Sequence, residues 1–169
     1  MHPTTRKHLT RAIGYRELGM LEDAHDEVER VRWDDRFLKE VLVQRLLIYN
    51  DMKQWDLVAG VARQLAADEP TEPQWWIQWA YGTRMDKGLD EGVAVLVDAK
   101  KRFPDHPTVT YYLGTYNCAG GDVETARELV TEAIQLDKSL QKVAIEDEDL
   151  ALLWENVELD CDSSQASKT

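Results

Sequence analysis

The sequence repeats with a period of 34 residues, which limits the chain to folds built from stacked copies of one small unit. Four similar segments begin at Gly19, Lys53, Lys87 and Gly121. In each, a large apolar residue stands three positions before a second core residue, and a third follows seven positions later; the three sets are Leu21, Trp55, Leu89 and Val123, then Ala24, Val58, Gly92 and Ala126, then Val31, Leu65, Ala99 and Ala133. Residues spaced by three, four and seven share one helix face, so each segment is predicted to be a helix packed against a partner.

The partner helix is predicted about a dozen residues upstream of each segment. Another amphipathic stretch recurs there in the same frame, with Ala12, Leu46, Ala80 and Gly114 at the equivalent position. Three of these four residues are small, which allows two helices to approach closely. Prolines at 70 and 104, and again at 73 and 107, indicate a turn before the next unit. The chain is therefore predicted to be mostly helical, with the valine-rich run at 93–97 as the one ambiguous stretch.

A helix-turn-helix of this length, with a glycine turn, a small residue in its second helix and a closing proline, resembles the tetratricopeptide (TPR) repeat. The fourth unit matches best, through Leu113, Gly114, Gly121, Ala126 and Ala133. The resemblance implies an all-α fold, a right-handed superhelix of antiparallel helix pairs. Four TPR units are expected, at 5–38, 39–72, 73–106 and 107–140. In the first unit, His8 and Arg11 replace apolar residues, which suits an end repeat whose outer face meets water.

The C-terminal part of the chain is expected to form a capping helix over 141–160, followed by a disordered tail over 161–169. Leu150, Leu153, Trp154 and Val157 make one apolar face, expected to cover the open core edge of the fourth repeat. The sequence leaves open whether this helix caps the solenoid or folds back into its groove.

The formal charge of −12 argues against nucleic acid and anionic membranes as partners, because both are bound through clusters of Lys and Arg. Much of the acidity lies in 146–162, which holds eight acidic side chains and no base. The basic residues near the N-terminus are not followed by the apolar core of a signal peptide. Cys118 and Cys161 fit neither a disulfide framework nor a zinc cluster, so we expect a cytoplasmic protein with free thiols.

The sequence carries none of the common catalytic or cofactor-binding motifs. The sequence has no GxxxxGK[ST], GxGxxG, GxSxG or HExxH pattern, and none of its four histidines has a second ligand at metal-binding spacing. The acidic run at 146–149 lacks the glycine and closing glutamate of a calcium loop. The chain is therefore predicted to be non-catalytic and to need no cofactor; an unrecognised hydrolase with paired carboxylates is the least favoured alternative.

The concave wall of a TPR domain is made by the first helix of each repeat, and partners usually bind there. In that frame the predicted peptide-binding groove comprises Ile13, Arg16, Val43, Leu47, Asn50, Gln74, Ile77, Tyr81, Arg84, Tyr111 and Thr115. The TPR frame assigns Trp76 and Trp79 to helix packing and leaves Trp75 less constrained.

The predicted groove is apolar and aromatic at its centre and polar at its edges. Leu9, Ile13, Gln44, Gln74 and Gln78 stand where chaperone-binding TPR domains carry a carboxylate clamp, so capture of an EEVD tail is disfavoured. Such a groove suits an amphipathic helix or a short apolar peptide. The sequence therefore predicts a scaffold for an unidentified protein or peptide partner, with self-association into a homo-oligomer as the alternative.

Overall fold

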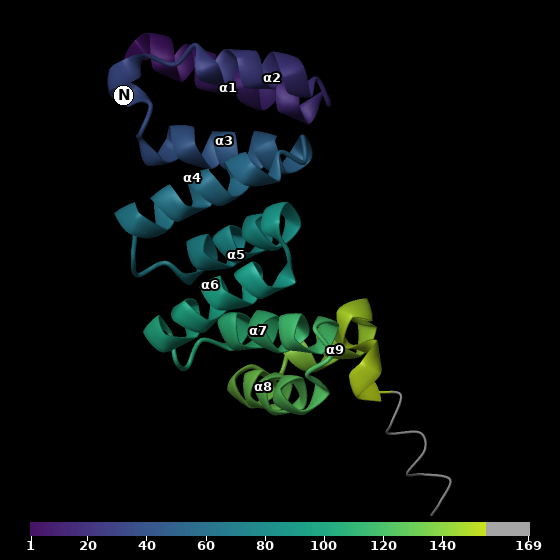
Figure 1. The fold of residues 1–169 in the computed structure, drawn as a ribbon. Helices are drawn as coiled ribbons and strands as arrows, with labels where there is room; N and C mark the ends of the chain where they lie inside the picture. Colours follow the sequence, from purple (N-terminus) through teal and green to yellow (C-terminus); the bar gives the residue numbers. More distant parts are fainter. Residues whose placement is uncertain (155–169) are drawn as a thin grey trace, which may run out of the picture. The chain divides into compact units, whose positions relative to one another are not determined.

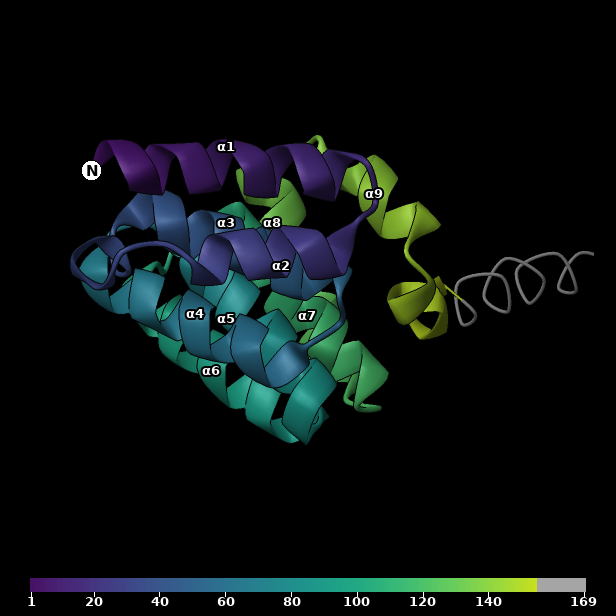
Figure 2. The same cartoon turned by 90° about the horizontal axis from the view of Figure 1, so that it is seen from above.

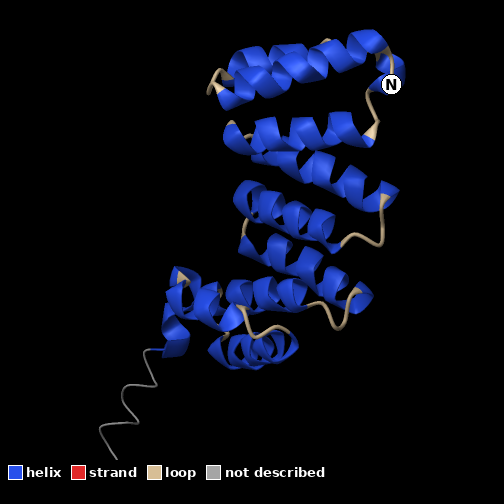
Figure 3. Ribbon diagram, turned by 180° about the vertical axis from the view of Figure 1, so that it is seen from behind, coloured by secondary structure: helices blue, strands red, loops and turns tan. Residues whose placement is uncertain are grey.

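The computed structural model describes residues 1–154, and the regular elements in that range are all helices (Figure 3). They are α1 (Pro3–Glu17), α2 (Leu21–Glu29), the 3₁₀ turn η1 (Trp33–Asp35), α3 (Lys39–Asp51), α4 (Trp55–Asp68), α5 (Pro73–Lys87), α6 (Leu89–Arg102), α7 (Pro107–Ala119), α8 (Val123–Leu136), α9 (Leu140–Glu146) and the 3₁₀ turn η2 (Glu148–Leu150). The predicted all-α fold class is confirmed, and the ambiguous run at 93–97 lies within α6.

The 34-residue period of the sequence is also the period of the helices. The second helices of the four pairs begin at Leu21, Trp55, Leu89 and Val123, at equal intervals of 34 residues. In the first, second and fourth pairs a residue with positive φ reverses the chain between the two helices; these residues are Gly19, Lys53 and Gly121. This left-handed conformation favours glycine, because a side chain there meets the backbone.

The third turn is different. Helix α5 continues through Lys87, and Gly88 alone, with a φ of 126°, separates it from α6. The chain divides into two compact units at this point: an N-terminal unit, Met1–Lys87, and a C-terminal unit that begins at Gly88. The two helices of the predicted repeat 73–106 thus belong to different units.

Within the N-terminal unit, each helix packs against the next one in chain order, and α1 also lies against α3 (Figures 1 and 2). Val41, Ile48, Val58 and Leu65 are fully buried side chains of this core. Helix α5 approaches α4 closely at Gly82, since a Cβ there would lie 2.7 Å from the Ala59 backbone nitrogen on α4. The backbone at Gly82 is helical, a conformation open to any residue. Glycine is therefore needed here for space and not for its conformational freedom.

A buried glutamate joins α1 to α2. Glu27 is 4% exposed, and its carboxylate is hydrogen-bonded to His8 Nδ1 at 2.7 Å and accepts from Arg30 at 2.8 Å. Arg11 lies 3.7 Å from the same carboxylate. The hydrogen bond with His8 is the main cause that lowers the pKa of Glu27, against the opposing effect of burial. His8 is therefore not simply a solvent-facing substitute for an apolar residue, as the sequence suggested, but part of a polar link between two helices.

Glu27→Gln should make the N-terminal unit less stable at pH 7, by about 1–3 kcal/mol, because hydrogen bonds to a charged group weaken when that group becomes neutral. The pKa of Glu27 in the folded chain lies below its ordinary value of 4.5. As the pH falls past 4.5, the unfolded chain therefore binds more protons at this residue than the folded chain does. The stabilisation is complete above the unfolded-state pKa and is lost as the pH falls through the folded-state pKa. Urea unfolding at pH 7 and at steps down to pH 3 should therefore show the difference between wild type and variant shrinking with acid. Glu22→Gln, at an exposed position of the same helix, is the control, and a difference that stays constant with pH would contradict this role.

In the C-terminal unit, Lys100 of α6 joins three segments. Its ammonium donates to the Pro104 carbonyl at 2.5 Å, to Thr110 Oγ1 on α7 at 2.7 Å and to Glu132 on α8 at 2.6 Å. Gly114 packs α7 closely on α8, because a Cβ there would lie 2.8 Å from a Val130 methyl group.

The prediction of a single helix over 141–160 is wrong in the described part of that range, because the chain after α8 forms several short elements. Helix α9 ends at Glu146, Asp147 has an extended backbone, and η2 leads into a further helical stretch at 151–154. The Asp147 side chain accepts from the Asp149 backbone N–H at 3.0 Å, which starts the new turn in place of continuing α9. Residues 155–160 of the predicted helix, including Val157, and the predicted tail 161–169 lie outside the described residues.

Candidate peptide-binding groove

The N-terminal unit has a hollow between α1 and α3, where the sequence placed the first two parts of the groove. Its volume is about 530 Å³, and its lining comes from Leu9, Ile13, Lys39, Glu40, Val43 and Gln44. The α3 residues are spaced by one, four and five, so they lie on one side of that helix. Two of the predicted groove residues, Ile13 and Val43, are thus brought together in one concave surface.

The floor of the hollow is apolar. Leu9 is buried, Val43 is half-buried, and Ile13 is 38% exposed. A large aliphatic side chain that faces a hollow and stays accessible gives an incoming apolar group surface to bury, which is the main favourable contribution at the centre of peptide-binding sites.

The rim carries both charges and is held by α5. Lys39 forms an ion pair with Glu69 at 2.8 Å, and its ammonium lies 5.9 Å from the centre of the Trp75 ring. The Trp75 indole N–H donates to Glu69 at 2.9 Å. The hydrogen bond from Lys39 is the main cause that lowers the pKa of Glu69, and the same bond raises the pKa of Lys39. Lys39 is therefore oriented at the rim before any partner arrives.

Trp75 has a position that the sequence did not predict. It is only 7% exposed and belongs to the core of the N-terminal unit, whereas Trp76 and Trp79 are half-buried around that core. The expectation that Trp75 is the least constrained of the three is wrong. Its indole N–H donates to Glu69, the residue that follows the last residue of α4.

Two predicted polar groove residues link neighbouring helices. Arg16 on α1 donates to Asp51 on α3 at 2.6 Å. Asn50 on α3 donates to the Leu46 carbonyl at 3.0 Å and to Gln78 on α5 at 3.4 Å. Both side chains thus have structural partners, and neither lines the hollow.

The predicted residues of α5 do not line the hollow either. Gln74 is exposed, and Ile77 and Arg84 are half-buried, as is Leu47 on α3. Tyr81 is exposed, but its ring packs edge-on against Trp55 of α4, with centroids 5.5 Å apart.

Tyr111 and Thr115, on α7 of the C-terminal unit, are closed to solvent. Tyr111 is 4% exposed and Thr115 is 2% exposed. The Tyr111 hydroxyl donates to Asp147 at 2.6 Å, so residues after α9 approach the α7 face that was expected to be open. Burial, reinforced by this hydrogen bond, raises the pKa of Tyr111 above its ordinary value.

Four lining residues, Leu9, Lys39, Glu40 and Gln44, lie outside the predicted groove set. The spacing of the three on α3 from Val43 contains the signal, because these four positions share a side of that helix. Among residues 1–154, no group of three or more potential metal ligands is assembled, and no helix is long and apolar enough to cross a membrane.

No family model and no curated protein matches this sequence. Solved structures do match. A structure described as MamA residues 41 to the end from Desulfovibrio magneticus RS-1 is 20% identical, with a TM-score of 0.66 over 80% of this chain and 76% of that one. A MamA RS-1 double mutant gives the same values, and a crystal structure of MamA gives a TM-score of 0.73 at 16% identity over 98% of this chain and 88% of that one. At this identity the likeness shows the fold, which is that of a TPR protein.

Proposed function

We propose that this chain is a non-catalytic scaffold that binds a protein partner through the hollow between α1 and α3. The observation that carries the proposal is the hollow itself, which has an apolar floor from the first helices of two successive repeats and a polar rim on α3, where Lys39 is ion-paired with Glu69. Its volume lies within the range of about 300–1,000 Å³ that is typical of ligand-binding clefts. The cytoplasmic location and the absence of catalysis remain predictions from the sequence.

The lining favours an amphipathic segment over a charged peptide tail. The accessible surface of Ile13 and Val43 offers burial to one or two aliphatic side chains, spaced as on one face of a helix. Lys39 and Glu40 place opposite charges at the rim, so neither sign of ligand is excluded. The partner class supported best is therefore a helical or extended segment that buries apolar side chains and pairs its polar groups at the edge.

Ile13→Glu should weaken partner binding by about tenfold or more, because a charge would replace the accessible apolar floor at the centre of the contact. The measurement is affinity capture from the native host, followed by determination of dissociation constants for each captured partner after purification. Leu57→Glu is a matched control: Leu57 is 39% exposed and lies on α4, against 38% for Ile13, and it does not line the hollow. Retention of every partner by Ile13→Glu, or equal loss in both variants, would place the binding surface elsewhere.

Self-association is the second candidate, and it is supported by two exposed aromatic side chains in the N-terminal unit. Trp33 and Phe37, in the segment between α2 and α3, are 72% and 64% exposed. Large aromatic side chains are enriched where proteins contact each other. Sedimentation over a range of concentrations would test this alternative, since a strict monomer at high concentration removes it.

A further inference from the structure

The face of α7 that corresponds to the groove is occupied by the chain's own C-terminal segment. Tyr111 and Cys118 on α7 form one buried apolar cluster with Leu150 and Leu153. These two leucines are fully buried, and η2 contacts α7 directly. Residues 147–154 therefore lie where a partner of the α7 face would bind; we call them the C-terminal strap.

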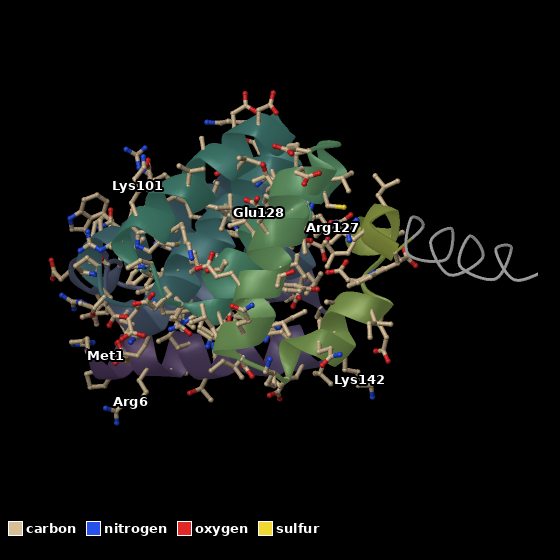
Figure 4. The ribbon with its side chains drawn as sticks, turned by 90° about the horizontal axis from the view of Figure 1, so that it is seen from below. Met1, Arg6, Lys101, Arg127, Glu128 and Lys142 are labelled. Carbon is tan, nitrogen blue, oxygen red and sulfur yellow. The ribbon has the colours of Figure 1, made fainter. Side chains whose placement is uncertain are left out.

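The strap contacts α7 through side chains that are regularly spaced along it. Asp147 accepts from the Tyr111 hydroxyl at 2.6 Å, and Leu150 and Leu153 follow at intervals of three residues. Arg127 on α8, labelled in Figure 4, donates to the Leu153 carbonyl at 3.4 Å. A carboxylate followed by two leucines, each one helical turn further on, is a recognition pattern that a separate peptide can also carry.

The strap's attachment is local and small. It follows the seven-residue α9, on which Val143 and Ile145 are exposed. Helices this short are marginal in isolation, so the strap's position depends on its contacts with α7 and α8 and on the Trp154 indole N–H, which donates to the Ala144 carbonyl of α9 at 3.1 Å. Segments held by few buried contacts open locally at a lower free energy than the core unfolds.

We propose that the α7 face is a second recognition surface, that the strap occupies it in cis, and that an acidic helical peptide of the form Asp-x-x-Leu-x-x-Leu competes for it. The inference extends the proposed scaffold function from the α1–α3 hollow to the fourth repeat and rests on it. The strap then acts as a built-in competitor that raises the affinity a partner needs.

The test uses the full chain and a fluorescent peptide with the sequence of residues 145–156. Leu150→Ser combined with Leu153→Ser should release the strap, and fluorescence anisotropy should then show the peptide binding about tenfold or more tightly than to wild type. Ala151→Ser combined with Leu152→Ser is the matched control, because both residues are exposed, and it should behave like wild type. A peptide with both leucines replaced by serine should not bind the released variant.

Cys118 provides a second readout that also covers failure of the double variant to fold. It is fully buried under the strap, and burial raises the pKa of its thiol despite an opposing hydrogen bond from the Leu153 backbone. In a Cys161→Ser background, Leu153→Ala should speed labelling of Cys118 by about tenfold, and added peptide should slow it again. Unchanged labelling, or no peptide binding by a folded strap-released variant, would overturn the proposal. Neither result depends on Ile13 or the hollow, so failure here is distinct from failure of the proposed function.

Discussion

Trp75→Ala is expected to lower the free energy of unfolding of the N-terminal unit by about 3–5 kcal/mol, the range for truncating a buried tryptophan. The ring is almost completely buried in the core, and its loss leaves a cavity that the surrounding helices cannot fully close. The substitution also removes the indole N–H that donates to Glu69 and the ring that lies beside the Lys39 ammonium. Chemical denaturation followed by helical circular dichroism measures the change.

Trp33→Ala is the matched control for Trp75→Ala, because it makes the same replacement in the same unit at a 72% exposed side chain. Its ring lies beside the Arg36 guanidinium, 5.2 Å from the ring centre, and an exposed contact of this kind contributes little, so the loss should stay below about 1 kcal/mol. Equal effects of the two substitutions would show that Trp75 is not part of the core.

Gly82→Ala should destabilise the chain by about 1–3 kcal/mol, although replacing a helical glycine by alanine usually stabilises. The added Cβ would lie 2.7 Å from the Ala59 backbone nitrogen and 2.8 Å from a Val58 methyl group. The nearer atom belongs to the backbone of α4, so the clash is relieved only when α4 and α5 move apart. Thermal and urea unfolding of the variant measure the cost.

Gly60→Ala gives the opposite expectation on the neighbouring helix. Gly60 is exposed on α4, and no atom lies within 4 Å of the Cβ it would gain. Its replacement should stabilise by about 0.5–1 kcal/mol through helix propensity alone. If Gly82→Ala stabilises the chain as Gly60→Ala is expected to do, the description of a close approach of α5 to α4 at Gly82 is wrong.

The fold was largely predictable because the period that specifies it is written into the core positions. Leu21, Trp55, Leu89 and Val123 begin their helices at the predicted interval. A constant spacing of this kind indicates a repeated packing geometry, and the spacing can be read from one sequence. The all-α class and the helix pairs follow from it.

Other features depend on contacts between residues that no spacing relates. The buried Trp75 donates its indole N–H to Glu69, and the buried Glu27 carboxylate lies among His8 and Arg11 of α1 and Arg30, which directly follows α2. Gly82 lies outside the recurring frame of small residues, so its role in helix approach was missed.

The candidate site was predicted in part. The frame brought Ile13 and Val43 to the same surface, since groove-facing positions follow the helix period. It could not show that Tyr111 and Thr115 are closed to solvent, because the residues near Tyr111 come from a segment after α9 that belongs to no repeat. Whether one part of the chain covers another depends on tertiary contacts, which the periodicity of the sequence does not encode.

Methyl-selective NMR of the full chain, titrated with a purified partner, tests the central claim most directly. The claim is that a partner is bound in the hollow between α1 and α3. Binding there should shift or broaden the methyl signals of Ile13 and Val43, which line the hollow, and leave Leu57 on α4 unchanged. A partner that binds while the Ile13 and Val43 signals stay unperturbed would contradict the account.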